Sequence, residues 1–202
     1  MVQKHNTFGV KLHLYKKEFE LYLKLLLKWN KVYNLTSITA PEEIMEKHFE
    51  DSLAVLPYLS GSGSLLDVGS GAGFPGIPIK IARPALSVTL VEATKKKCNF
   101  CDTVIRELGL KNIKVVHGRV EDSKTAAAIG KFDIIVSRAT FSLEKLVSTA
   151  VPYLEEGGKI IAMKGRNCIA ELKDATTTIL RLKLKIAAEE DYKYGRLIII
   201  SR

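Results

Sequence analysis

The chain has 202 residues, of which 47% are hydrophobic and 26% charged, and this predicts one globular domain with room for a helical extension. No apolar run approaches the ~18 residues of a membrane span, and three cysteines are too few for a disulfide framework, so we expect a cytoplasmic protein. The net charge is +9, and most of it lies in residues 61–202, where 23 Lys/Arg face 15 Asp/Glu, which favours a polyanionic partner such as nucleic acid but serves solubility equally well.

The first part of the chain predicts helices. Residues 1–6 lack the apolar run of a secretory signal. Residues 12–29 carry Leu and aromatic side chains at helical spacing, and residues 29–36 mix aromatic and amide side chains, which we interpret as a connector. Thr39 and Glu42 have the spacing of a capping box, which predicts the start of a second helix.

A Gly-Ser-Gly-Ser run at 61–64 indicates a boundary. We expect residues 1–60 to be an N-terminal helical extension packed on the core, and residues 61–202 to be the main domain.

Strand-like and helix-like runs alternate through the main domain. The predicted strands are 65–68, 87–92, 113–117, 132–137, 159–163 and 196–201, and the predicted helices are 76–82, 94–109, 121–129, 142–154 and 168–182. Gly109 and Gly157-Gly158 stand where helix C-termini are expected. Alternation with Val- and Ile-rich strands predicts an α/β fold with a parallel sheet covered on both faces.

The stretch 65–78 is the main functional signal. An apolar strand is followed by glycines at 69, 71, 73 and 76 and then by the start of a helix. Such glycines let the backbone turn sharply and approach a ligand closely, and a helix start directs free N–H groups toward it. The stretch therefore predicts a nucleotide-type binding loop at the carboxyl ends of the strands.

Two cofactor classes use this arrangement. Residues 71–76 match the dinucleotide pattern G-x-G-x-x-G, so an NAD-linked oxidoreductase is one alternative. Asp67, ahead of the first glycine, resembles the loop acid of class I methyltransferases, and a carboxylate suits the cationic groups of S-adenosylmethionine but repels a pyrophosphate. Glu92 ends the second strand about 20 residues after the loop, where an acid accepts hydrogen bonds from ribose hydroxyls. We favour the methyltransferase.

Four segments carry a closer resemblance: Trp-Asn-Lys-Val-Tyr-Asn-Leu-Thr at 29–36, His-Phe-Glu-Asp-Ser at 48–52, the loop at 67–78, and Ser-Arg-Ala at 137–139. In this order they resemble the bacterial 16S ribosomal RNA (guanine-N7) methyltransferase family, formerly named glucose-inhibited division protein B. The likeness covers about residues 20–165. It implies a Rossmann-like, mostly parallel seven-stranded sheet, S-adenosylmethionine as cofactor, and 16S rRNA or the small ribosomal subunit as partner. We expect a monomer.

The resemblance assigns roles position by position. Gly69 and Phe74 match loop contacts to the cofactor, Val120 and Glu121 match the pair beside the adenine, and Arg138 matches the binding arginine after the fourth strand. With the acids and glycines above, the predicted cofactor site comprises Asp67, Gly69, Gly71, Gly73, Phe74, Glu92, Val120, Glu121 and Arg138.

Guanine N7 presents a lone pair and no proton, so the expected reaction needs no general base and positioning is the main requirement. We therefore name no catalytic residue. The residues predicted to hold RNA phosphates or the guanine edge are Lys95, Lys96, Arg119, Arg138, Lys164 and Arg166. Because such chemistry leaves no catalytic-base signature, a cofactor-sensing RNA-binding module without turnover is a second alternative.

Other residues have structural interpretations. Cys98 and Cys101 form a C-x-x-C inside a predicted helix, and we interpret them as packed side chains and expect no metal site. His48 orders the RNA side of the cleft or bonds locally, and both interpretations stay open. Trp29 and Tyr33 have the chemistry to stack on bases, but packing of the helices on the sheet is the favoured interpretation.

Overall fold

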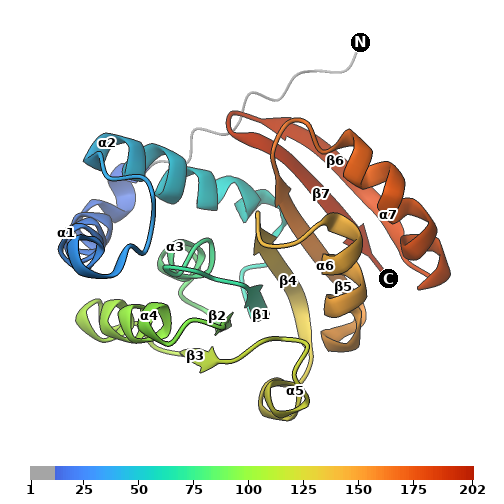
Figure 1. Ribbon diagram of the computed structural model, residues 1–202, viewed down its shortest axis with the longest axis horizontal. Coiled ribbons are helices and arrows are strands. Elements are labelled where there is room, and N and C mark those ends of the chain that lie inside the picture. The colour runs from blue at the N-terminus through green and yellow to red at the C-terminus, as the bar shows by residue number, and fades with distance from the viewer. Residues whose placement is uncertain (1–11) are drawn as a thin grey trace.

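The computed structural model describes residues 12–202 (Figure 1). The expectation that residues 1–6 carry no signal lies outside the described residues, as do the first eleven positions of the predicted extension. Within the described part, seven strands form one sheet in the order β3-β2-β1-β4-β5-β7-β6. This confirms the predicted α/β fold with a mostly parallel seven-stranded sheet.

Five parallel strands form the centre and one side of the sheet, and an antiparallel pair completes it. The parallel strands are β1 (Gly63–Val68), β2 (Leu86–Glu92), β3 (Ile113–His117), β4 (Phe132–Arg138) and β5 (Leu154–Lys164). β7 (Gly195–Ser201) runs antiparallel to β5, and the edge strand β6 (Lys185–Tyr192) runs antiparallel to β7. Because β1 to β4 are parallel, their carboxyl ends meet at one edge.

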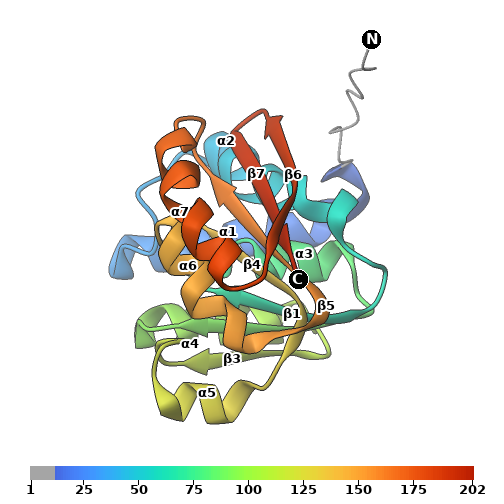
Figure 2. The same ribbon diagram turned by 90° about the vertical axis from the view of Figure 1, so that its right-hand side faces the viewer.

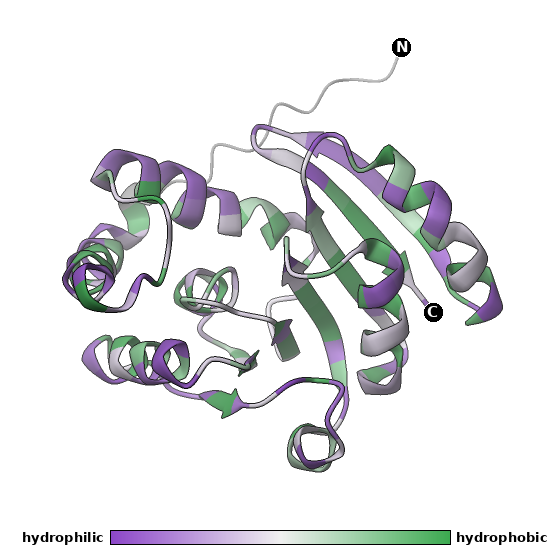
Figure 3. Ribbon diagram, viewed as in Figure 1, coloured by the Kyte–Doolittle hydropathy of each residue, from purple (hydrophilic) through white to green (hydrophobic). Residues whose placement is uncertain are grey.

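Helices cover both faces of the sheet (Figure 2). One face carries α1 (Lys16–Tyr33), α3 (Gly76–Ala82) and α4 (Lys95–Glu107), and the other carries α5 (Ser123–Ile129), α6 (Leu143–Ala150) and α7 (Ile169–Arg181). Figure 3 shows hydrophobic colour along the central strands and hydrophilic colour on the outer sides of the helices. The sheet thus separates two apolar cores, as expected when both of its faces are buried.

The N-terminal segment packs on the α3 side of the sheet. It contains η1 (Leu12–Tyr15), α1, α2 (Pro41–Ile44), the π-helical η2 (Met45–Glu50) and the 3-10 helix η3 (Leu53–Tyr58). Phe19 and Phe49 are fully buried and stack with ring centroids 5.0 Å apart, and both belong to the core that contains Ile77 of α3. The segment therefore shares a core with the sheet, and the boundary at residue 60 stays a prediction.

Two expectations for this segment were wrong. α1 continues to Tyr33 and ends at Asn34, whose φ of 49° gives it the left-handed conformation of a helix C-cap, so residues 29–33 are helical rather than a connector. α2 begins after Ala40, with Pro41 in its first turn and no side-chain cap, so Thr39 does not form a capping box. Proline at the first helical position needs no N–H partner.

The C-terminal part departs from expectation at two places. The edge strand β6 was not predicted, because its Glu189-Glu190-Asp191 run interrupts any apolar pattern. Gly157-Gly158 lie inside β5, since Phe132 pairs with Leu154 and Ile134 with Lys159, so residues 155–158 bulge out of the ladder. The helix before them ends earlier, at α6, and is followed by the 3-10 turn η4 (Val151–Tyr153).

Candidate functional site

A cavity of about 140 Å³ lies at the carboxyl ends of β1 and β4. The loop after β1, the N-terminal segment and the end of β4 all contribute to its wall. Its lining residues are Leu35, Thr36, His48, Gly69, Ser70, Gly71, Ala72, Phe74 and Arg138. This is the edge at which an open α/β sheet binds its ligands.

The glycine loop has the conformation that its sequence predicts. Gly69, Gly71 and Gly73 have φ values of 71°, 59° and 91°, in the region that favours glycine. A Cβ at Gly69 would collide with Thr140, and one at Gly73 would lie 2.6 Å from the Tyr22 hydroxyl. At Gly71 the same position is open space, so the middle of the loop faces the cavity.

Asp67 supports the loop from behind and does not line the cavity. Its Oδ2 accepts a hydrogen bond of 2.8 Å from the Gly76 N–H at the start of α3. Its Oδ1 is buried and has no partner among the described residues. Burial raises the pKa of this carboxyl to about 7, against a weaker opposing effect of the Gly76 hydrogen bond. The cofactor contact expected of Asp67 stays a prediction.

Glu92 ties the loop to the end of β2. Its Oε2 accepts from the Gly71 N–H at 2.9 Å, and its Oε1 accepts from the Thr94 N–H at 2.8 Å. Each carboxylate oxygen can accept a second hydrogen bond. Glu92 therefore fixes the loop at the place where it faces the cavity and keeps acceptor capacity for a ligand.

Arg138 is held by the N-terminal segment. Its guanidinium donates to Asp51 Oδ2 at 2.9 Å and to the Lys47 carbonyl at 3.2 Å, and it lies 5.1 Å from the centroid of the Phe74 ring. Asp51 is itself fixed, because the Tyr192 hydroxyl donates to its Oδ1 at 2.6 Å. The orientation of Arg138 at the cavity thus depends on residues 87 positions before it and 54 positions after it in the chain.

His48 is a neutral imidazole in this arrangement. Its Nδ1 lies 3.2 Å from Arg138 Nη2, which can only donate, so Nδ1 accepts. Nε2 therefore carries the proton and donates to Thr36 Oγ1 at 2.8 Å. Burial and the nearby guanidinium lower the pKa of His48 to about 4. Its ring stacks on Phe74 with centroids 4.7 Å apart. These contacts support local bonding, and the RNA-side alternative stays a prediction.

Tyr22 connects α1 to the loop. Its hydroxyl donates to the Ala72 carbonyl, and its ring stacks on Phe74 with centroids 5.3 Å apart and planes 10° apart. The sequence pattern predicted a buried face for this helix but gave no reason to connect Tyr22 with the loop. Sequence reasoning missed Tyr22, Asp51 and Tyr192, although Asp51 lies in a segment that carries the family resemblance. It also assigned no site role to four lining residues of the cavity, which are Leu35, Thr36, Ser70 and Ala72.

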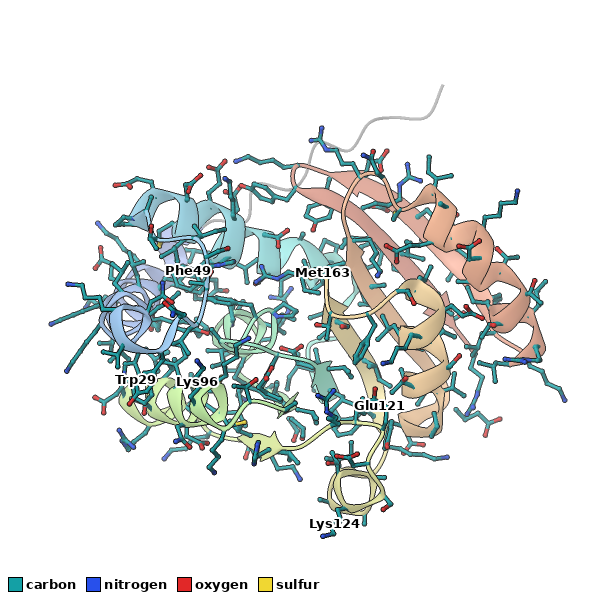
Figure 4. The ribbon with its side chains drawn as sticks, in the orientation of Figure 1. Trp29, Phe49, Lys96, Glu121, Lys124 and Met163 are labelled. Carbon is teal, nitrogen blue, oxygen red and sulfur yellow. The ribbon has the colours of Figure 1, made fainter. Side chains whose placement is uncertain are left out.

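Val120 and Glu121 lie outside the cavity wall, in the turn after β3. Figure 4 places Glu121 beside the start of α5, well apart from Trp29. Val120 is buried and its carbonyl accepts from the Tyr153 hydroxyl at 2.6 Å. Glu121 forms an ion pair of 3.3 Å with Lys145. Their predicted position beside an adenine would extend the site along the strand ends and stays a prediction.

The residues predicted to contact RNA fall into two groups. Lys95, Lys96, Arg119 and Arg166 are exposed, with the Arg166 guanidinium donating to the Lys193 carbonyl at 2.7 Å. Lys164 is only 8% exposed, and its ammonium pairs with Glu171 at 2.7 Å and donates to the Phe141 carbonyl. A buried and paired ammonium does not suit a phosphate contact, so this position does not support the role expected of Lys164.

The cysteines of α4 are packed side chains. Cys98 and Cys101 are buried, and the Cys98 thiol donates to the Glu92 carbonyl at 3.2 Å. Among the side chains described for residues 14–202, no group of three His, Cys, Asp or Glu is placed to hold a metal ion. In the same part of the chain no helix has the length and apolar character needed to cross a membrane.

Comparison with known proteins identifies relatives. Residues 15–192 match the sequence profile of the family described as rRNA small subunit methyltransferase G. A protein of that name from Caldanaerobacter subterraneus subsp. tengcongensis is 42% identical over 190 residues, which cover 92% of this chain and 79% of the relative. Another from Myxococcus xanthus is 48% identical over 141 residues, which cover 70% of this chain and 65% of the relative.

The fold is also found in solved structures. A crystal structure titled as a SAM dependent methyltransferase from Aquifex aeolicus superimposes with a TM-score of 0.62 over 79% of this chain and 92% of that chain. Sequence identity to it is 16%, so this likeness concerns the fold alone.

Proposed function

The chain belongs to the rRNA small subunit methyltransferase G family, and from this premise we propose that it transfers a methyl group from S-adenosylmethionine to N7 of a guanine in 16S rRNA. The observation that carries the proposal is the cavity that the glycine loop forms with His48, Phe74 and Arg138. We further propose a monomeric, cytoplasmic enzyme that acts on the RNA or on the small subunit.

The residues around the cavity fit this cofactor. The Ser70 hydroxyl lies in the cavity wall, buried and without a partner among the described residues, which indicates a polar ligand atom beside the loop. Glu92 brings carboxylate oxygens to the same loop, and these suit hydroxyl groups and a cationic ligand. S-Adenosylmethionine, when bound, supplies a methyl group on a cationic sulfur. The neutral thioether that forms when the methyl group is transferred is a good leaving group.

The protein's own contribution is to position the guanine and to exclude water. Guanine N7 has a free lone pair, so no side chain has to remove a proton. In agreement with this, His48 and Arg138 bond to each other and to neighbouring groups rather than pointing a free base into the cavity. Phe74, 5% exposed beneath both side chains, supplies a rigid apolar floor. Such a site acts mainly through proximity and orientation.

The test is methyl transfer in vitro to 16S rRNA and to small subunits that lack the modification. Mass spectrometry of nuclease fragments should find one added methyl group per RNA, with the lability that N7-methylguanine shows in alkali. Absence of transfer to both substrates would contradict the proposal, and a methyl group on another atom would contradict the N7 assignment.

The cofactor assignment has a separate test. S-Adenosylhomocysteine should raise the midpoint of thermal unfolding, because a ligand that binds only the folded state stabilises it by mass action. NADH at the same concentration should leave the midpoint unchanged. A midpoint that rises with NADH and not with S-adenosylhomocysteine would favour the NAD-linked alternative.

A further inference from the structure

The C-terminal half of α1 and the start of α4 carry lysines and no acidic residues. The sequence has no Asp or Glu between residues 21 and 41 or between residues 93 and 101. The same intervals contain six lysines: Lys24, Lys28 and Lys31 on α1 and Lys95, Lys96 and Lys97 on α4. Among the described residues none of the six forms an ion pair. Cations clustered without counter-charges repel one another, and a polyanion relieves that repulsion.

The end of α1 also exposes apolar side chains. Val32 is 69% exposed and Tyr33 is 40% exposed. The Tyr33 ring packs on Trp29 with centroids 5.3 Å apart, and Trp29 in turn packs on Phe100 of α4 at 5.6 Å. Trp29 therefore joins the two helices, and Figure 4 shows it beside Lys96 where they meet. The Tyr33 ring thus packs on Trp29 and is otherwise partly exposed to solvent.

This surface leads directly into the cavity. Two residues after Tyr33, Leu35 and then Thr36 form part of the cavity wall, at most ~7 Å further along an extended chain. The turn is rigid, since the Asn30 side chain donates to the Thr36 carbonyl at 3.0 Å and accepts from its N–H at 2.9 Å. On the α4 side, Lys95 follows the Glu92–Thr94 turn that holds Gly71.

We propose that this surface, here called the α1–α4 rim and made up of Lys28, Lys31, Val32, Tyr33, Lys95 and Lys96, binds the single-stranded RNA that flanks the target guanine. The lysines contact phosphates and Tyr33 stacks on an unpaired base, the combination by which proteins hold single strands. The proposal rests on the proposed function, since it assumes that the cavity receives a base of an RNA.

The experiment measures the affinity of the full chain for a 16S rRNA fragment as a function of salt, and methyl transfer to the same fragment. The test variants are Lys28→Ala/Lys31→Ala and Lys95→Ala/Lys96→Ala. The matched control is Lys173→Ala/Lys185→Ala, which removes two exposed lysines of α7 and β6. Each test variant should reduce the slope of log affinity against log salt by about 1.4, the value for two contacts to a single strand. The control should not.

Tyr33→Ala and Tyr33→Phe separate stacking from charge. The alanine variant should weaken RNA binding by at least about fivefold at every salt concentration, while the phenylalanine variant, which keeps the ring, should bind as the wild type does. S-Adenosylhomocysteine affinity and thermal midpoint are measured on each variant to establish that the fold and cavity are intact.

Two outcomes would contradict the proposed role of the α1–α4 rim. They are unchanged salt slopes in both lysine test variants, or a slope reduction in the lysine control equal to that in the test variants. Failure of the wild-type chain to methylate any RNA would instead contradict the proposed function, so the two failures are distinguishable.

Discussion

Arg138 is a single side chain on which several contacts of the site converge. Replacement by alanine removes its bonds to Asp51, His48 and the Lys47 carbonyl and leaves the buried Asp51 carboxylate without its cation. Because hydrogen bonds of charged groups contribute about 1.5–3 kcal/mol each, we expect Arg138→Ala to weaken S-adenosylhomocysteine binding by about tenfold or more and to reduce methyl transfer at least as much. Titration calorimetry measures the first and a transfer assay the second.

Arg138→Lys provides the conservative comparison. Lysine keeps the positive charge but lacks the planar guanidinium that reaches three acceptors at once, so we expect a loss of affinity and transfer smaller than that of Arg138→Ala. Arg106→Ala, which removes an exposed arginine of α4 paired with Glu107, is the control and should bind normally. Wild-type affinity in Arg138→Ala would show that the guanidinium does not shape the site.

Asp67 and His48 should affect stability in opposite directions as pH changes. Burial raises the Asp67 pKa from 3.8 to about 7, so the folded state keeps a proton that the unfolded chain releases, and the free energy of unfolding falls as pH rises through this interval. Burial and Arg138 lower the His48 pKa from 6.5 to about 4, so the unfolded chain binds the extra proton and the free energy of unfolding rises with pH. In the wild type the two effects largely cancel.

Asp67→Asn should expose the histidine effect. The amide oxygen still accepts from the Gly76 N–H, but the group no longer titrates. Urea unfolding of the ligand-free protein should then give a free energy that rises more steeply between pH 4 and pH 6.5 than in the wild type. An unchanged pH profile would mean that Asp67 has an ordinary pKa in the folded protein.

The turn between β6 and β7 forms an element that reaches the site from the far end of the chain. Tyr192 donates to Asp51, Tyr194 donates to Glu50 at 2.7 Å, and Lys193 pairs with Glu46 at 2.6 Å, so three successive residues hold η2 and the residue that follows it. Asp51 also accepts a hydrogen bond from Arg138, whereas the described contacts of Glu50 and Glu46 do not include Arg138. The turn therefore has one contact whose partner, Asp51, bonds directly to Arg138, and two contacts whose partners do not.

This difference allows a matched pair of variants. Tyr192→Phe and Tyr194→Phe each remove one hydroxyl and should cost similar stability, about 1 kcal/mol. Tyr192→Phe should in addition weaken S-adenosylhomocysteine binding by about threefold or more, because Asp51 loses a fixed partner and Arg138 loses its alignment. Calorimetry on both variants checks this, and equal affinities would limit Tyr192 to fastening the helix.

An element could be predicted from the sequence when the residues that stabilise it lie within the element or next to it in the chain. The β1 loop and α3 were predicted at their observed positions, because glycines, an apolar strand and an apolar helix all lie within residues 65–82. β6 was missed since its Glu189-Glu190-Asp191 run is stabilised by pairing with β7 rather than by its own pattern. Lys164 looked like a free cation in sequence, and only the fold brings Glu171 to it.

At the level of the whole molecule, the N-terminal segment and the sheet should unfold together. Tyr22 and Phe49 lie in the same core as Ile77 and Leu90, and Tyr22 holds the loop through the Ala72 carbonyl. Without the segment Phe74 and the apolar sides of α3 and α4 that the segment covers would be open to water, and apolar burial is the main source of stability. We therefore expect the two parts to unfold as one cooperative unit, and the boundary at residue 60 stays a prediction.

Native-state hydrogen exchange tests this cooperation in the full chain. Amides in the centre of α1, around Tyr22 and Leu26, should exchange with the same free energy as amides of β1 and β4, within about 1 kcal/mol, because both require global unfolding. S-Adenosylhomocysteine should raise both values equally, since a ligand of the folded state stabilises every group that opens only by global unfolding. A lower free energy for α1, unaffected by ligand, would show instead that the segment opens on its own and that the cavity wall formed by Leu35, Thr36 and His48 is the part of the site that moves.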